Sequence, residues 1–199
     1  YNIINKNIEI KQVINDNLLE LGQLIYSNIE NKYKDSIKNV KLRTFFPIIT
    51  GKKNVEDTDI NGIYPFFSCS KDIMYSNSYS FNSKSILLAG NGDFNVKYYS
   101  GKFEAYQRTY VLTPYNAKLI GLLFFGIRSN ITSLTKGNRG SVISFIVKSM
   151  IEDFVLKLPE NYNCINEINE LNVILDSLSS NEKQLTSLLK LKKYLLSSL

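Results

Sequence analysis

The side chains with the clearest chemical potential are cations, amides and hydroxyls placed beside glycine and asparagine turns in the middle of the chain. Lysine and arginine neutralise phosphates, whereas arginine, asparagine and aspartate reach the edges of bases. Small neighbouring residues would let the backbone approach a duplex closely. The predicted DNA-contacting set comprises Lys52, Lys53, Ser70, Lys71, Asn91, Asp93, Lys97, Tyr98, Arg108, Lys136, Asn138, Arg139 and Ser141.

Each member of this set also has a simpler interpretation. A single lysine or arginine is most often a solvated surface charge, and a tyrosine such as Tyr98 is more often packed in a core than stacked on a base. The run Lys136-Gly137-Asn138-Arg139-Gly140-Ser141 combines cations, an amide and small residues in one stretch. The hypothesis of DNA contact therefore depends on the set as a whole.

The patterns that support catalysis are absent from the sequence. The chain has no His, which excludes most hydrolytic triads and imidazole acid-base chemistry. Cys69 and Cys164 lie far apart, so no zinc site is predicted. Gly90-Asn91-Gly92 lacks the further glycine of a dinucleotide-binding turn, and no Pro-Pro pair of a methyltransferase motif occurs. We therefore expect no catalytic residues, no cofactor and no metal.

The positive charge is concentrated in the middle of the chain. Residues 1–39 hold five basic and five acidic residues, residues 40–158 hold fifteen and eight, and residues 159–199 hold four and five. The net charges are thus 0, +7 and −1. A basic centre between neutral flanks suggests a polyanion partner for the centre and protein contacts for the flanks. Neither a secretion signal nor a membrane-spanning apolar run is recognised, which predicts a cytoplasmic protein.

Both flanks have the periodicity of long helices. In the C-terminal flank an a/d seam, broken at Glu182 and Lys192, is predicted to extend for about 35 residues. Its members are Ile165, Ile168, Leu171, Leu175, Leu178, Leu185, Leu189, Leu196 and Leu199. The N-terminal flank repeats Ile4, Ile8, Ile14, Leu18, Leu21, Ile25 and Ile29. The simplest arrangement is an antiparallel coiled coil of the two flanks, and the alternative is that each helix packs only on its own domain.

The centre has the composition of a β-rich domain. Nine of the ten glycines and all four prolines lie between Val40 and Pro159. Strands are predicted at Ser85–Ala89, Thr109–Leu112 and Ser141–Ile146, tight turns at Asn61-Gly62 and Asn91-Gly92, and one helix at Ala117–Arg128. The fold class is therefore α+β, with a curled, mainly antiparallel sheet. The predicted division is residues 1–38, 39–159 and 160–199.

The order of several segments resembles the specificity subunits of Type I restriction-modification enzymes. Residues 7–26, NIEIKQVINDNLLELGQLIY, are similar to the end of a conserved helix that precedes a target recognition domain in that family. The entry, middle and exit of such a domain resemble Lys41-Leu42, Thr50-Gly51-Lys52, Gly62–Phe66, Ile86–Gly92, Gly101–Phe103, Tyr110–Leu112, Gly140–Ile151 and Leu156–Pro159. After the exit proline the family usually has a Glu-Gln pair, whereas Asn-Glu repeats occupy residues 163–170 here.

This resemblance implies one target recognition domain between two conserved helices, where a complete subunit has two of each. The chain is then either the C-terminal half of a longer subunit or a half-subunit that dimerises. Its opening at Tyr1, partway through a helical pattern, favours the first. The second recognition half would lie in the same longer chain or in a second copy.

The resemblance also implies that the chain determines which DNA site is recognised, whereas its partners catalyse the reactions. The domain would read one half of a bipartite site in double-stranded DNA, and the helix pair would set the gap between the halves. Methyltransferase subunits would dock on it, together with a motor-nuclease subunit in some systems. Two alternatives stay open: a coiled-coil adaptor that does not bind DNA, and the recognition segment of a single-chain restriction-methylation enzyme.

Overall fold

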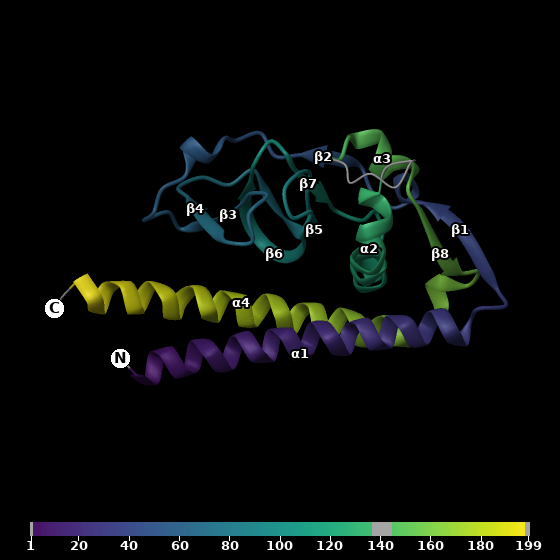
Figure 1. The fold of residues 1–199 in the computed structure, drawn as a ribbon, viewed down its shortest axis with the longest axis horizontal. Coiled ribbons are helices and arrows are strands. Elements are labelled where there is room, and N and C mark those ends of the chain that lie inside the picture. Colours follow the sequence, from purple (N-terminus) through teal and green to yellow (C-terminus); the bar gives the residue numbers. More distant parts are fainter. Residues whose placement is uncertain (1, 137–144, 198–199) are drawn as a thin grey trace.

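The computed structural model describes residues 2–136 and 145–197, in which long helices flank a β-rich centre (Figure 1). The helices are α1 (Asn2–Lys32), α2 (Ile120–Thr135), α3 (Lys148–Asp153) and α4 (Glu167–Ser197). The strands are β1 (Ile37–Lys41), β2 (Ile48–Thr50), β3 (Tyr64–Phe67), β4 (Ile73–Ser76), β5 (Phe81–Ala89), β6 (Val96–Ala105), β7 (Thr109–Leu112) and β8 (Val155–Pro159). None of the helices in this described part is long and apolar enough to span a membrane.

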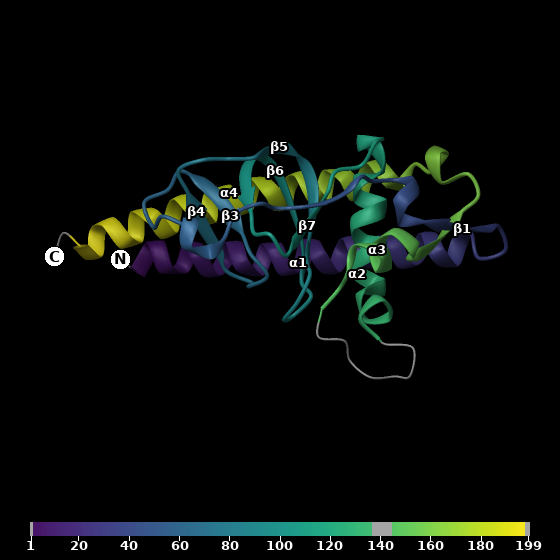
Figure 2. The ribbon, with the colours of Figure 1, turned by 90° about the horizontal axis from the view of Figure 1, so that it is seen from above.

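The two long helices lie side by side and run antiparallel, as the heptad pattern predicts (Figures 1 and 2). At one end of the pair, Lys32 forms an ion pair of 2.5 Å with Glu167. Toward the other end, the Lys11 ammonium donates to the side-chain oxygen of Asn181 at 3.0 Å. Both helices also pack against the central domain. The helices therefore pair with each other and contact the domain, and the alternative of packing on the domain alone is wrong.

The predicted seam residues divide between buried and exposed positions. On α4, Ile168, Leu171, Leu175 and Leu185 are buried as predicted, whereas Leu189 and Leu196 are exposed. On α1, Ile8 and Ile29 are buried, whereas Ile14 and Leu21, which belong to the same predicted repeat, are exposed. The polar position of the α4 seam is occupied by the buried Asn181, which contacts α1 through hydrogen bonds to Lys11 and Asn15.

Within the described residues, the main sheet has six strands in the order β2-β7-β5-β6-β3-β4. All neighbours are antiparallel except β3 and β6, and the separate pair β1 and β8 is antiparallel too. The predicted strands Ser85–Ala89 and Thr109–Leu112 are confirmed, the first as the end of the longer β5. Of the predicted strand at Ser141–Ile146, residues 141–144 lie outside the described part of the chain. The mainly antiparallel sheet between two long helices confirms the predicted α+β fold.

The helix predicted at Ala117–Arg128 is confirmed, and it connects the sheet to both long helices. A short 3-10 turn at Ala117–Leu119 leads into α2, whose first eight residues, Ile120 to Ile127, are buried. Figure 2 shows α2 crossing the helix pair. Gly22 of α1 permits this contact, since a Cβ there would lie 2.0 Å from Phe125 Cζ. The centre of the hydrophobic core therefore lies where α1, α2, α4 and the sheet meet.

Candidate nucleic-acid interface

Four segments that are distant in sequence meet at one end of the curled sheet, and hydrogen bonds hold them together. We define them as the loop edge: residues 51–53, 68–72, 90–95 and 106–108. The Gln107 amide donates to the Lys53 carbonyl at 3.0 Å, and the Tyr106 amide donates to the Phe67 carbonyl at 2.9 Å. The Asn95 side chain donates to the Cys69 carbonyl at 2.7 Å. Each segment is thus anchored to a neighbour through its backbone.

The loop edge brings together seven of the thirteen predicted DNA-contacting residues. Lys52, Ser70, Lys71, Asp93 and Arg108 are exposed, while Lys53 and Asn91 are partly exposed. Four of these seven side chains are cations, against one carboxylate. Exposed cations on a short, ordered surface can contact several phosphates of one duplex, while neighbouring amides reach bases.

Arg108 has the most firmly anchored backbone of these cations. Its carbonyl oxygen accepts a hydrogen bond from the Gly90 amide at 2.9 Å and from the Cys69 thiol at 3.4 Å. Its side chain remains exposed at the β6–β7 turn. A guanidinium on a fixed backbone loses less conformational freedom on binding, and it can pair with guanine through two parallel hydrogen bonds.

Two glycines allow the loop-edge segments to approach this closely. A Cβ at Gly51 would lie 1.9 Å from the Ala105 carbonyl oxygen, and one at Gly90 would lie 2.5 Å from the Arg108 carbonyl oxygen. The sequence shows both residues as turn glycines. The structure shows that their small size permits close contact between the loop-edge segments.

Lys97 and Tyr98 lie on β6 next to the loop edge, and both line a cavity together with residues of α1 and α4. The Lys97 ammonium donates to the Ser70 carbonyl and lies 5.9 Å from the centroid of the Phe67 ring. Burial lowers the pKa of Lys97 to about 8, despite the opposing effect of nearby acidic groups. In this geometry Lys97 supports the 68–72 segment from below.

Tyr98 connects the sheet to α4. Its hydroxyl donates to the Asp176 carboxylate at 3.3 Å, and its ring packs edge-on against Phe124 with centroids 6.4 Å apart. Burial, followed by the Asp176 charge, raises the pKa of this tyrosine. These contacts give Tyr98 a packing role between the sheet and the helices, which is the simpler interpretation of this side chain.

The remaining four candidates belong to the segment that follows α2. Lys136 is exposed at the end of that helix, and Asn138, Arg139 and Ser141 lie outside the described residues. Where the described chain resumes, Phe145 forms a β-bridge with Asn91, and the Ile146 amide donates to the Gly90 carbonyl at 2.7 Å. The exit of that segment is therefore held against the loop edge.

One exposed amide at the loop edge was absent from the predicted set. Gln107 is exposed between Lys53 and Arg108, at the tip of the β6–β7 turn. A glutamine side chain can pair with adenine through two hydrogen bonds in the major groove. Its position beside Arg108, in a turn before a β-rich run, is the sequence feature that could have identified it.

The sequence profile described as "Type I restriction modification DNA specificity domain" matches residues 7–193. The chain belongs to this family. It is also similar to the Type I restriction enzyme EcoDI specificity subunit of Escherichia coli, with 36% identity over 156 residues. That match covers 78% of this chain and 35% of the relative, so the chain spans well under half of that protein.

Solved structures of this family share the fold. A Type I restriction-modification S subunit from M. genitalium superposes with a TM-score of 0.64 at 16% identity, covering 98% of this chain and 55% of that one. The HsdS subunit of Thermoanaerobacter tengcongensis gives 0.51 at 12% identity, covering 94% and 49%. A chain from a study of assembly and conformational transition in the Type I system gives 0.53 at 11%, covering 98% and 56%.

Proposed function

We propose that this specificity-family chain recognises one half of a bipartite site in double-stranded DNA, and that the loop edge contacts the bases and phosphates. The observation that carries the proposal is the convergence of Lys52, Lys53, Lys71 and Arg108 on loops anchored by backbone hydrogen bonds. In this proposal residues 39–159 form the target recognition domain. Residues 1–38 and 160–199 form the spacer that sets the distance to the other half-site.

The experiment that tests this function is selection of randomised duplexes, first by the chain alone and then with the methyltransferase subunit of the same system. We expect enrichment of a short asymmetric motif, or of two copies at a fixed spacing if the chain dimerises. Arg108→Ala should relax base preference at one position, whereas Lys52→Ala should weaken binding to all sequences alike. Lys34→Ala, which removes an exposed cation from the turn after α1, is the matched control.

The selection also separates the alternatives. An adaptor without DNA binding would enrich no motif, and its weak retention of duplexes would lack the steep dependence on salt that phosphate contacts produce. Absence of both enrichment and co-elution with the methyltransferase would reject the proposed function. A catalytic role for the chain itself forms no part of the proposal, because its partners would supply the methylation and cleavage.

The outer face of α1 supports the docking of those partners. Its exposed apolar side chains repeat at helical spacing on the side away from the buried seam: Ile3, Ile10, Val13, Ile14, Leu21 and Leu24. A groove of about 430 Å³ between Ile14 and Leu18 of α1 and Val173 of α4 continues this surface. An apolar helical stripe of this kind fits a helix of another subunit.

Docking on this stripe is tested by co-elution of the chain with the methyltransferase subunit. Ile10→Lys combined with Leu24→Lys places two charges on the stripe and should abolish co-elution while leaving duplex binding unchanged. The matched control is Gln12→Lys, because Gln12 is exposed on the same helix and lies off the stripe. If the double variant co-elutes as well as the unaltered chain, the partner docks elsewhere.

A further inference from the structure

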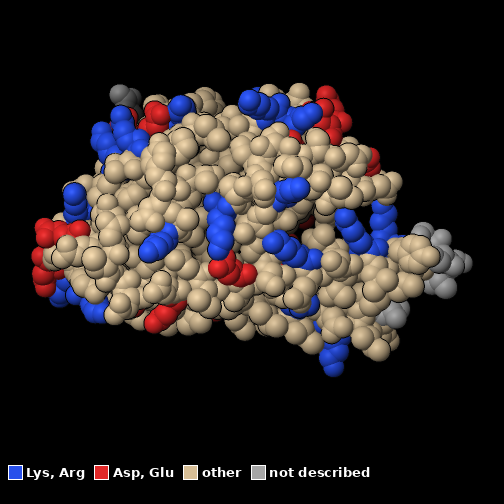
Figure 3. All heavy atoms as spheres, turned by 180° about the vertical axis from the view of Figure 1, so that it is seen from behind, with Lys and Arg blue, Asp and Glu red and all other residues tan. Residues whose placement is uncertain are grey.

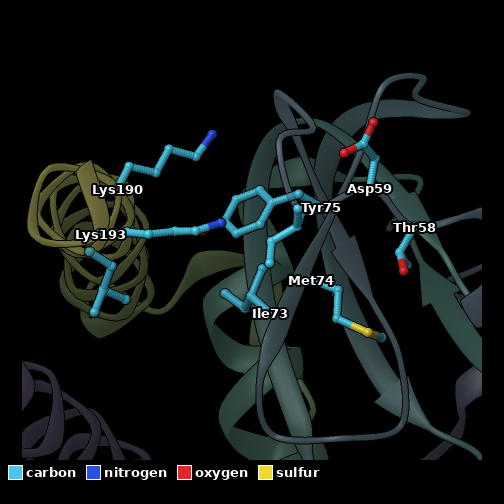
Figure 4. A pocket seen from close by; sticks show the side chains of 9 residues that line it. Thr58, Asp59, Ile73, Met74, Tyr75, Lys190 and Lys193 are labelled. Atoms are coloured by element: carbon cyan, nitrogen blue, oxygen red, sulfur yellow. The ribbon is translucent and has the colours of Figure 1, made fainter. Parts of the chain in front are cut away.

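A groove lies between strand β4, the loop before β3 and the C-terminal half of α4 (Figure 4). Its volume is about 410 Å³. The lining residues are Thr58, Asp59, Ile60, Ile73, Met74, Tyr75, Leu189, Lys190 and Lys193. The groove begins where the 68–72 segment ends, and it follows β4 away from the loop edge. None of its residues belongs to the predicted DNA-contacting set.

One wall of this groove is the edge strand of the main sheet. Strand β4 pairs with β3 alone and ends the strand order. The Tyr75 carbonyl accepts a hydrogen bond from the Asp59 amide at 2.9 Å, which shows that the polar backbone groups of Tyr75 point away from β3. Since alternate residues of a strand share one direction, those of Ile73 point outward too.

These outward groups remain available for pairing. Among the described residues, no loop or side-chain hydrogen bond reaches the amide or carbonyl of Ile73 or the amide of Tyr75. Unpaired groups on an edge strand are a template for another extended segment. The 58–60 loop covers only the Tyr75 carbonyl, so the strand stays open beside Ile73.

The floor of the groove is apolar and accessible. Ile60 is 74% exposed and Leu189 is 50% exposed, and both line the groove together with Met74 and Ile73. Large apolar side chains that face one another across a narrow groove gain free energy when an apolar side chain from a partner fills it. A duplex of DNA offers no such side chain, and the groove is too small to admit one.

The rim of the groove is cationic. The Lys190 ammonium is fixed by the Gly62 carbonyl at 3.1 Å, and it lies 4.5 Å from the centroid of the Tyr75 ring. Lys193 is exposed one turn further along α4 and extends toward Tyr75 (Figure 4). Figure 3 shows further basic side chains around a hollow in this face of the molecule.

Asp59 is the only acidic side chain among the described residues that line the groove, and it already has partners. The Asp59 carboxylate accepts hydrogen bonds from the Asn61 amide at 2.8 Å and from the Asn77 side chain at 2.6 Å. These bonds lower the pKa of Asp59, so it stays ionised, but they engage both of its oxygens. The two lysines are therefore left to attract carboxylates of an incoming segment.

We propose that this groove binds a short extended segment of a partner protein, in which acidic residues alternate with apolar ones, as an added strand on β4. The backbone of the segment would pair with Ile73 and with the amide of Tyr75, its apolar side chains would pack on Ile60 and Leu189, and its carboxylates would contact Lys190 and Lys193. This interaction is separate from recognition of DNA by the loop edge, and it holds whether or not the proposed function does.

The test uses the full chain and a fluorescein-labelled heptapeptide of alternating glutamate and valine, followed by anisotropy. We expect saturable binding that weakens with salt and falls by at least about tenfold in Lys190→Glu combined with Lys193→Glu. Lys102→Glu, an exposed charge reversal on β6, is the matched control and should bind as the unaltered chain does. Circular dichroism and thermal melting establish that the variants are folded.

A second peptide separates strand addition from simple charge attraction. The same heptapeptide with every backbone amide N-methylated keeps its charges but cannot donate to the ladder, and it should also bind at least about tenfold more weakly. Slower hydrogen exchange at the amides of Ile73 and Tyr75 on addition of the parent peptide would support the pairing. Equal binding of both peptides would overturn the proposal.

Competition with DNA separates this proposal from the proposed function. We expect a duplex carrying the selected motif to leave the peptide bound, and the double lysine variant to keep its affinity for that duplex. If the duplex displaces the peptide and the variant loses affinity for DNA instead, the groove belongs to the DNA surface and the peptide proposal fails. Loss of duplex binding in Arg108→Ala alone bears only on the proposed function.

Discussion

Asn172 of α4 caps the first turn of α2 through the backbone of Gly121. The Asn172 side-chain oxygen accepts from the Gly121 amide at 2.9 Å, and its side-chain nitrogen donates to the Lys118 carbonyl at 2.8 Å. A Cβ at Gly121 would lie 2.7 Å from the Leu171 Cβ, so only glycine permits this approach. One side chain of the C-terminal helix thus fixes the helix that joins the sheet to the helix pair.

Replacing Asn172 should weaken the packing of the central domain against α4. Asn172→Ala leaves the Gly121 amide and the Lys118 carbonyl without their partner, which should lower the free energy of unfolding by about 1–2 kcal/mol. Asn169→Ala, at an exposed position one turn earlier, should change it by less than about 0.5 kcal/mol. Urea denaturation followed by circular dichroism measures both. Equal effects of the two variants would show that Asn172 does not act as a cap.

The loop edge should be sensitive to the size of residue 51. Gly51→Ala places a methyl group 1.9 Å from the Ala105 carbonyl oxygen, and the backbone must shift to relieve that contact. We expect a loss of about 1–3 kcal/mol in stability and weaker duplex binding. Gly92→Asn is the matched control, because Gly92 has a φ of +69° with no atom near its Cβ position, and asparagine tolerates that conformation. Unchanged stability in Gly51→Ala would mean that the loops can separate freely.

Burial of Lys97 should make stability depend on pH in the alkaline range. The native pKa is lowered to about 8 from an ordinary 10.5, so the unfolded chain binds more protons than the native chain between these values. The free energy of unfolding should therefore rise with pH between about 8 and 10, at a slope of at most about 1.4 kcal/mol per pH unit. Partial solvent exposure of the side chain reduces the total to about 1–2 kcal/mol.

Lys97→Met tests this linkage. The variant keeps a long apolar side chain and should lose the rise between pH 8 and 10. The acidic groups near Lys97 that oppose the lowering of its pKa, Cys69, Asp72 and Glu182, are present in both proteins, so the difference between the two pH profiles reports on Lys97. Guanidinium denaturation at several pH values measures the effect. If the unaltered chain and the variant have parallel pH profiles, Lys97 has an ordinary pKa in the folded protein.

The sequence predicts the positions of helices and strands more successfully than it predicts what their side chains contact. Turn residues and β-rich runs are sufficient to place β5, β7 and the loops, because local chemistry decides them. Lys97 and Tyr98 follow a turn in sequence, yet Lys97 donates to the Ser70 carbonyl and Tyr98 contacts Asp176 of α4, because tertiary packing decides what covers each face of a strand. A backbone contact between distant segments, such as that of Lys53 with Gln107, has no signal in the sequence of either segment alone.

The heptad pattern of α4 illustrates the same limit. Apolar spacing reports that a position is buried, but α4 packs against α1 on one side and against α2 and the sheet on another. Glu182, which interrupts the predicted seam, lies in the cavity that Lys97 and Tyr98 line, and burial there raises its pKa. Its neighbour Asn181 instead occupies the polar position toward α1. Because α4 packs against two partners, its apolar pattern does not indicate which of its residues contacts which partner.

The polar contact between α1 and α4 leads to a prediction about paired substitutions. Asn181 is 8% exposed, donates to the Lys11 carbonyl at 2.9 Å and to the Asn15 side-chain oxygen at 2.7 Å, and accepts from the Lys11 ammonium at 3.0 Å. Asn181→Leu removes one partner from three polar groups of α1, of which the Lys11 ammonium still donates to the Gln184 side chain. We expect the free energy of unfolding to fall by about 1–3 kcal/mol.

The triple variant Lys11→Leu, Asn15→Leu and Asn181→Leu should recover that loss or exceed the original stability, since apolar contacts replace the three polar side chains at once and the Lys11 carbonyl stays within the backbone of α1. This layer would then be apolar, and the preference of the seam for this one partner should fall, because a polar layer penalises other pairings. Sedimentation velocity should therefore detect oligomers of the triple variant. Additive losses across the three substitutions, with no change in oligomeric state, would show that Lys11, Asn15 and Asn181 contribute independently and that the layer does not select the partner.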